Sequence, residues 1–170
     1  MTIDKKYIDL FHNVSVNAAF AAYHLVGKKD KIAADKAAVD SMRNNLNNIN
    51  MNGQIVIGEG ELDKAPMLYI GEKLGTGSGP DLDIAVDPLE GTNFAANNLP
   101  GALSVIAIAE KDNLFTAPET YMQKIAVGKI EKGVVDLDFD LKKNIYNLAD
   151  YKNKDISSLT ACILDRPRHK

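Results

Sequence analysis

The sequence is poor in cysteine and in aromatic residues, and these shortages narrow the kinds of protein that it encodes. Cys162 is the single cysteine among 170 residues, so an intramolecular disulfide is excluded and a reducing cytoplasm is the expected compartment. Its neighbours in LTACIL are apolar, which favours a buried, unreactive thiol. Tryptophan is absent and aromatic residues make up only 6%, whereas hydrophobic residues reach 45%. The core is therefore expected to be mainly aliphatic.

Long hydrophobic runs and an excess of positive charge are also missing. The N-terminal stretch lacks a continuous apolar signal core. The longest weakly polar run, residues 14–27, is interrupted by Ser15, Asn17 and His24, so it is not expected to span a membrane. A net charge of −3 argues weakly against a nucleic-acid surface. We therefore expect a cytoplasmic protein without a nucleic-acid or membrane partner.

The spacing of apolar residues predicts helices early in the chain and strands later. Helical spacing covers residues 4–26 and 33–49, and residues 65–75 resemble a third helix with Pro66 in its first turn. A fourth helix is expected over residues 141–151. Strands are expected at 54–61, 81–87, 102–111, 114–117, 123–128, 133–139 and 158–164. This order predicts the α+β class, with N-terminal helices packed on a mixed, largely antiparallel sheet.

The end of the sequence resembles an interrupted fold. The length and the hydrophobic fraction fit one compact domain. However, the basic stretch DRPRHK follows directly after an expected strand, where domains usually finish with a solvated tail or a docked helix. We therefore expect residues 1–170 to form an incomplete fold. Exposed apolar strand surface would then favour a homo-oligomer.

Acidic side chains gather in three places, and the first two are ambiguous. Asp30 and Asp35 lie at the start of the second expected helix, where acids that complement the helix dipole are the better explanation. Glu59, Glu61 and Asp63 alternate after a strand and point the same way if the chain stays extended. Three neighbouring anions repel one another unless water or a cation lies among them. A solvated loop and a metal site therefore explain this second cluster about equally well.

The third place, the stretch DIAVDPLEGTN, is the most specific. Asp87 ends an expected strand, Pro88 prevents its continuation, and Glu90 follows closely. Carboxylate oxygens are the ligands that Mg²⁺ and Mn²⁺ prefer. Gly91 and Thr92 come next, at a turn or helix start where backbone N–H groups can bind phosphate. A plain turn explains the glycine and the proline, but it does not explain acids paired with a donor-rich turn. We therefore interpret this stretch as a functional site.

The three acidic clusters together supply enough oxygen atoms for a pair of divalent ions, which is a recurrent device for cleaving phosphate esters. Histidine is not needed for such a site. His12, His24 and His169 do not have the spacing of a zinc site, and the first two are expected on helix surfaces.

These motifs resemble a known family. DPLEGT is similar to the DP(I/L)(D/E)GT signature of the lithium-sensitive phosphatases, which include inositol monophosphatases and fructose-1,6-bisphosphatases. In addition, ADKAAVDSMR, IVIGEGELDKAPMLYIGEKLGTG, DIAVDPLEGT and DRPRH resemble class II fructose-1,6-bisphosphatases of the GlpX type, in the expected order. Inositol phosphatases do not share the long central motif. The similarity covers nearly the whole chain, which corresponds to the N-terminal half of a family member. The resemblance therefore implies that residues 1–170 are an N-terminal metal- and phosphate-binding domain whose C-terminal domain is absent, with a complementing C-terminal half as a candidate partner.

The resemblance implies an activity and a set of metal ligands. The reaction is hydrolysis of the 1-phosphate of fructose 1,6-bisphosphate, giving fructose 6-phosphate and phosphate in bacterial gluconeogenesis, with Mn²⁺ or Mg²⁺ as cofactor. Sedoheptulose 1,7-bisphosphate is a second candidate substrate. Asp35 and Glu59 match ligands of one metal ion, and Asp87 and Glu90 match ligands of another. Thr92 matches a residue that helps to activate the attacking water.

The resemblance also implies further catalytic and substrate-binding residues. Lys31, Glu61 and Asp63 match additional catalytic positions. Guanidinium groups suit a sugar phosphate because they pair with two phosphate oxygens at once. Without the resemblance, RPRH would be a basic tail and Tyr121 a half-buried aromatic residue. The matched substrate-binding positions are Glu90, Gly91, Thr92, Tyr121, Arg166, Pro167 and Arg168.

Two other functions stay open because the second half of family members supplies another metal-binding Glu and part of the sugar pocket. One is a fragment that binds metal or sugar phosphate without catalysis. The other is a structural subunit that a partner chain completes. Losing one ligand from a coupled metal site weakens the binding of the metal.

Overall fold

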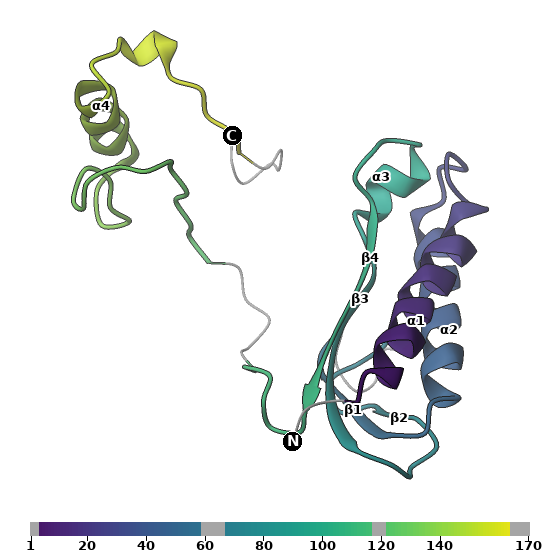
Figure 1. Ribbon diagram of the computed structural model, residues 1–170. Coiled ribbons are helices and arrows are strands. Elements are labelled where there is room, and N and C mark those ends of the chain that lie inside the picture. Colours follow the sequence, from purple (N-terminus) through teal and green to yellow (C-terminus); the bar gives the residue numbers. More distant parts are fainter. Residues whose placement is uncertain (1–3, 59–66, 117–121, 164–170) are drawn as a thin grey trace. The chain divides into compact units, whose positions relative to one another are not determined.

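The computed structural model describes residues 4–58, 67–116 and 122–163. The chain forms two compact units, Met1–Ala117 and Pro118–Lys170. Among the described residues, the first unit holds a sheet and three helices, and the second holds a helix and a short 3₁₀ helix (Figure 1). No helix in these described ranges is long and apolar enough to cross a membrane.

Two long helices begin the first unit and lie side by side on one face of the sheet (Figure 1). α1 (Lys6–Tyr23) and α2 (Lys31–Asn47) confirm the helices predicted at 4–26 and 33–49 to within a few residues. The Asp30 side chain caps α2 by accepting the Ala33 N–H at 3.0 Å. His12 and His24 are exposed, as predicted. The buried residues recur every three or four positions: Tyr7, Phe11, Val14, Ala18 and Ala22 in α1, and Ala34, Ala38, Val39, Met42 and Leu46 in α2.

In the described part of the chain, the sheet has four strands in the order β2–β1–β3–β4. The strands are β1 (Asn52–Ile57), β2 (Lys73–Leu74), β3 (Asp81–Glu90) and β4 (Leu103–Glu110). β1 and β3 are parallel, whereas β1–β2 and β3–β4 are antiparallel. This mixed sheet confirms the predicted α+β class. The β3–β4 register shifts between Asp87 and Glu90, where Pro88 has no N–H to donate to the ladder.

The core of the first unit lies between the two helices and one face of the sheet (Figure 1). Alternate residues of β3, namely Leu82, Ile84 and Val86, are buried there, as expected for a strand with one covered face. Tyr7 and Phe11 are the aromatic members of the core cluster among the described residues. The core is therefore mainly aliphatic, as predicted.

The helix predicted over residues 65–75 is wrong for its described part, residues 67–75. These residues form a turn that leads into β2. Gly71 has φ = +95°, a left-handed conformation that a right-handed helix does not accommodate. Leu68 is fully buried, so the apolar spacing that suggested a helix instead places one side chain in the core.

The second unit contains the helix that was predicted and none of the predicted strands within its described residues. α4 (Leu141–Tyr151) matches the predicted bounds and is capped by Asp140, which accepts the Lys143 N–H at 2.7 Å. A 3₁₀ helix, η1, covers Ile156–Ser158. The strands expected at 123–128, 133–139 and 158–163 are turns or irregular segments, as are residues 114–116 of the first unit. Short apolar runs stay unpaired there because the described part of this unit offers no neighbouring strand.

The prediction for Cys162 is also wrong, because its side chain is exposed. The stretch LTACIL was expected to be a core strand, and Leu159–Ile163 instead follows η1 as an irregular segment. Without strand pairing, nothing buries the thiol within the described residues.

Candidate active site

The fold brings the start of α2 to the end of β3. The segment between α1 and α2 is tied to α3 (Thr92–Ala96), which follows β3 directly. Gly27 N–H donates to the Ala95 carbonyl at 2.9 Å, and Lys29 N–H donates to the Ala96 carbonyl at 2.8 Å. α3 also packs against α2 (Figure 1). Residues from two distant parts of the sequence therefore share one end of the sheet.

Three carboxyl groups meet at this end. Asp87 lies where β3 loses its register with β4, Glu90 ends β3, and Asp35 lies near the start of α2. Burial raises the pKa of Asp87 to about 6, and a hydrogen bond and the charge of Glu90 act in the same direction. The charge of Asp35 adds a smaller increase, and the Leu89 N–H opposes it by donating to the Asp87 carboxylate. Asp87 therefore interacts with both other acids.

The carboxylates of Asp35 and Asp87 are only partly satisfied. Burial raises the pKa of Asp35 as well. One oxygen of each side chain, Oδ1, is buried and has no hydrogen-bond partner among the described residues. Buried carboxylate oxygens without a donor are costly, and a bound cation would remove that cost. The two side chains therefore fit the chemistry of a hard divalent ion.

The described residues alone do not complete a metal site. Within residues 4–58, 67–116 and 122–163, no group of three or more His, Cys, Asp or Glu side chains has the arrangement of a metal site. Glu59, the other predicted ligand, lies outside the described residues. The site is therefore a set of neighbouring acids that needs further oxygen ligands.

Gly91 and Thr92 turn the chain away from these acids. Gly91 precedes α3 with φ = +78°, a conformation that favours glycine, and a Cβ there would lie 3.0 Å from Phe94 Cδ2. Thr92 is the first residue of α3 and is partly buried. Thr92 thus starts a helix of a single turn, two residues after Glu90.

Of the remaining predicted site residues, one lies within the described residues and the others lie outside them. Lys31 is exposed at the start of α2, one turn before Asp35. The structure therefore groups Asp35, Asp87 and Glu90, with Gly91 and Thr92 directly after them. Glu59, Glu61, Asp63, Tyr121, Arg166, Pro167 and Arg168 lie outside the described residues.

Sequence reasoning did not single out Ser104, which borders the same region. Ser104 lies in β4 between Leu103, the partner of Glu90, and Val105, the partner of Asp87. Its Oγ is buried and has no hydrogen-bond partner within the described ranges. Alternation along LSVIAIAE groups Ser104 with Ile106 and Ile108, which pack against the core, but a lone serine in a strand gives no sign of a site.

Comparison with known proteins identifies relatives over almost the whole chain. The family model for bacterial fructose-1,6-bisphosphatase, glpX-encoded, matches residues 6–170. A class 2 fructose-1,6-bisphosphatase 1 of Escherichia coli is 50% identical over 159 residues, which are 94% of this chain and 47% of that protein. A class 2 fructose-1,6-bisphosphatase of Haemophilus influenzae is 48% identical, over 94% of this chain and 48% of its own length.

A third relative carries a double name. The D-fructose 1,6-bisphosphatase class 2/sedoheptulose 1,7-bisphosphatase of Prochlorococcus marinus is 47% identical over 99% of this chain and 50% of its own length. The chain thus spans about half the length of the curated relatives that it matches. Because the family model covers residues 6–170 and the carboxyl groups of Asp35, Asp87 and Glu90 interact, the chain belongs to the family of glpX-encoded bacterial fructose-1,6-bisphosphatases.

Proposed function

We propose that this chain carries the metal- and phosphate-binding part of a phosphatase that hydrolyses the 1-phosphate of fructose 1,6-bisphosphate. The products are fructose 6-phosphate and phosphate, and the reaction belongs to gluconeogenesis. The observation that carries the proposal is a pair of buried Oδ1 atoms, one on Asp35 and one on Asp87, that have no hydrogen-bond partner in the described part of the chain and lie close to Glu90. Membership of the fructose-1,6-bisphosphatase family supports the choice of substrate.

The acids hold the divalent ions in this proposal. Asp35 and Glu59 bind one ion, Asp87 and Glu90 bind another, and Mn²⁺ or Mg²⁺ suits oxygen ligands of this kind. When bound, the ions supply positive charge that stabilises the phosphate oxygens during displacement. The raised pKa of Asp87 supports this assignment, because it reflects burial and the nearby acids Glu90 and Asp35. A cation between the acids would offset the repulsion among them.

The residues that follow orient the reacting groups. Thr92, on the first turn of α3, orients the attacking water through its hydroxyl group. Gly91 lets the backbone approach the phosphate closely, because no Cβ stands in the way. Lys31, at the start of α2, adds a positive charge on the same side of the helix as Asp35.

The other proposed residues rest on the family resemblance. Glu61 and Asp63 assist catalysis. The sugar phosphate is held by Glu90 and by Tyr121, Arg166, Pro167 and Arg168, where the two guanidinium groups pair with phosphate oxygens.

Sedoheptulose 1,7-bisphosphate is a second candidate substrate. The double name of the Prochlorococcus marinus relative favours it. Both sugars present a phosphate ester at C1, so one site can serve both. Phosphate release measured with the two sugars side by side distinguishes them, and turnover of only one would assign the specificity.

A non-catalytic binding fragment is the alternative that the half-length match favours. Calorimetric titration with Mn²⁺, run beside a phosphate-release assay on the same chain, separates the two. We expect Mn²⁺ binding that Asp87→Asn abolishes, and we expect Asp87→Ala and Thr92→Ala to abolish turnover in the full-length relative from Escherichia coli at the equivalent positions. Near-normal turnover in both variants would falsify the assigned roles. Binding without turnover by the present chain favours the fragment.

We propose a cytoplasmic protein that associates with a second copy or with a complementing C-terminal half. The single cysteine supports a reducing compartment. Exposed apolar side chains on the sheet support association: Leu103 is 59% exposed, and Val105 and Ile57 are also exposed. Light scattering on the purified chain, alone and mixed with the second half of a relative, tests both forms of association.

A further inference from the structure

The loop between α1 and α2 carries a group of lysines whose charges are not neutralised. Lys28, Lys29 and Lys31 are exposed, and within the described ranges none of their ammonium groups takes part in a hydrogen bond or an ion pair. Asp30 lies among them, but its carboxylate accepts the Ala33 N–H and caps α2. The loop therefore presents three cations that are free to bind an anion.

Lys29 has a backbone conformation that is unusual for lysine. Its φ is +60°, in the left-handed region where most side chains are strained and glycine is not. The other non-glycine residues with positive φ in the described part of the chain are Asn98, Asp112 and Asn153. Asn and Asp tolerate this conformation, whereas lysine has no such preference. A strained lysine on an exposed loop suggests that its side chain has a function.

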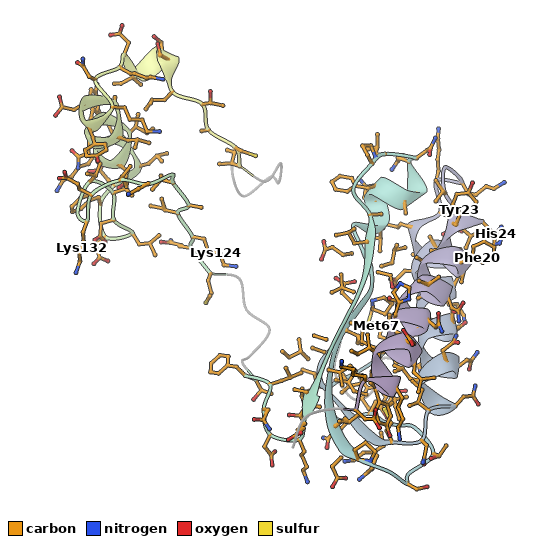
Figure 2. All side chains as sticks on the ribbon, viewed as in Figure 1. Phe20, Tyr23, His24, Met67, Lys124 and Lys132 are labelled. Atoms are coloured by element: carbon orange, nitrogen blue, oxygen red, sulfur yellow. The ribbon has the colours of Figure 1, made fainter. Side chains whose placement is uncertain are left out.

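Backbone hydrogen bonds fix Lys29 beside α3. The end of α1, where Phe20 and His24 are labelled in Figure 2, leads directly into this loop. Lys29 N–H donates to the carbonyl of Ala96, the last residue of α3, at 2.8 Å. Thr92 is the first residue of α3, about 6 Å away along the helix axis. The Lys29 backbone therefore contacts one end of a helical turn whose other end is Thr92.

A cation at this position suits the proposed substrate. Asp35, Asp87 and Glu90 repel an incoming phosphate ester, and bound metal ions offset that repulsion only close to the ions. A lysine ammonium group has three hydrogen-bond donors on a flexible stem and binds phosphate as a point charge. Because the Lys29 backbone is already fixed, only its side chain loses freedom when the substrate binds.

We propose that Lys29 is a substrate-binding residue whose ammonium group pairs with a phosphate oxygen of the sugar phosphate. This inference rests on the proposed function, which supplies the substrate. Lys28 is the matched neighbour, because it carries the same charge on the same loop without a positive φ. A lysine that is merely solvated would leave the affinity for sugar phosphate unchanged when its charge is removed.

The test is calorimetric titration of the 170-residue chain at saturating Mg²⁺ with fructose 6-phosphate and, separately, with inorganic phosphate. Lys29→Gln removes the charge and keeps most of the length, Lys29→Arg keeps the charge, and Lys28→Gln is the control. Lys29→Gly is a second variant without the charge. It serves if Lys29→Gln does not fold, because glycine relieves the strain of the positive φ. Titration with Mn²⁺ alone checks that the metal site is intact in each variant.

We expect fructose 6-phosphate to bind about fivefold more weakly to Lys29→Gln and to Lys29→Gly, which is the upper range for an exposed charge pair. Lys29→Arg should bind it as the unaltered chain does, Lys28→Gln should lose less than twofold, and no variant should bind Mn²⁺ more weakly. Unchanged affinity in Lys29→Gln would overturn the assignment. Equal losses in Lys28→Gln and Lys29→Gln would also overturn it, because the loop would then act only through its overall charge.

The two probes distinguish a phosphate on the sugar from free phosphate. Weaker binding of inorganic phosphate by Lys29→Gln, with fructose 6-phosphate unaffected, would overturn the pairing with sugar phosphate. If the unaltered chain binds Mn²⁺ but neither probe, the proposed phosphate-binding function is wrong and the role of Lys29 is overturned with it. If the unaltered chain binds fructose 6-phosphate and Lys29→Gln binds it equally well, only the role of Lys29 is overturned.

Discussion

At the scale of single residues, Asp87 shows what the fold does to a carboxyl group. Burial, Glu90 and Asp35 raise its pKa to about 6, because each makes the charged form less favourable. In the unfolded chain these neighbours are dispersed, so the pKa returns to its usual value near 4. The folded state without metal therefore binds the Asp87 proton more tightly than the unfolded state does.

This difference predicts that the metal-free chain loses stability as the pH rises. The contribution of protonated Asp87 is fully present below about pH 4 and is lost as the pH passes through about 6. The urea midpoint, followed by far-UV circular dichroism in a chelator, should fall between pH 4.5 and about 7. Asp87→Asn should reduce this fall because its side chain does not titrate.

The control is Asp9→Asn, since Asp9 is exposed on α1 away from the site. The control should retain the fall in the urea midpoint that the unaltered chain shows. An equal fall in Asp87→Asn would mean that the titration of Asp87 does not set the pH dependence.

Sequence reasoning located these acids but could not by itself bring them together. The local sequence around Asp87 and Glu90 is enough to suggest a functional site, because acids at the end of a strand flank a proline. The local sequence around Asp35 is not, and by itself Asp35 is best explained as an acid at a helix start. Its meeting with Asp87 follows from the contact of α3 with α2. The family resemblance implied that both acids are metal ligands, but local spacing did not. An ion pair between Arg43 of α2 and Glu72 before β2, with Arg43 Nε 2.7 Å from Glu72 Oε1, was also missed because only the fold brings its members together.

At the scale of secondary-structure elements, the periodic spacing of apolar residues predicted an element correctly where tertiary packing favours the same element. α1, α2 and α4 have regular apolar spacing, and Asp30 and Asp140 cap two of them. The strands predicted at 81–87 and 102–111 from their β-like runs were confirmed as β3 and β4, which pair with each other in the sheet. The apolar runs at 123–128 and 133–139 have the composition of strands, but strands need neighbours, and none is present in the described part of the second unit.

Two glycines after β2 provide a test of the packing at this turn. Gly75 and Gly77 both have positive φ, +94° and +78°. A Cβ at Gly75 would lie 2.3 Å from the Met51 carbonyl oxygen, whereas a Cβ at Gly77 would meet nothing within 4 Å. Alanine at Gly77 should therefore cost about 1 kcal/mol of unfolding free energy, from backbone conformation alone.

Alanine at Gly75 should lower the free energy of unfolding by about 1–3 kcal/mol more than alanine at Gly77 does, because the added methyl group also displaces the backbone of Met51. Urea unfolding of the two variants side by side measures the difference. Equal losses would show that the turn moves freely and that Met51 does not constrain it.

At the scale of the whole molecule, the chain matches its family over residues 6–170 but spans about half the length of its relatives. The first unit holds α1, α2 and the mixed sheet, which together position Asp35, Asp87 and Glu90. The second unit holds α4 and leads to the arginines proposed to bind phosphate. We therefore propose that the first unit can bind metal by itself, whereas turnover would also require the proposed substrate-binding residues.

The most direct measurement is anomalous diffraction at the manganese edge from crystals of this chain grown with Mn²⁺. The account predicts two anomalous peaks, one at coordination distance from a carboxylate oxygen of Asp35 and one at coordination distance from a carboxylate oxygen of Asp87. Asp87→Asn, crystallised in the same way, should lose the peak beside residue 87. No peak near these two residues at saturating Mn²⁺, or a peak that contacts neither of them, would contradict the account.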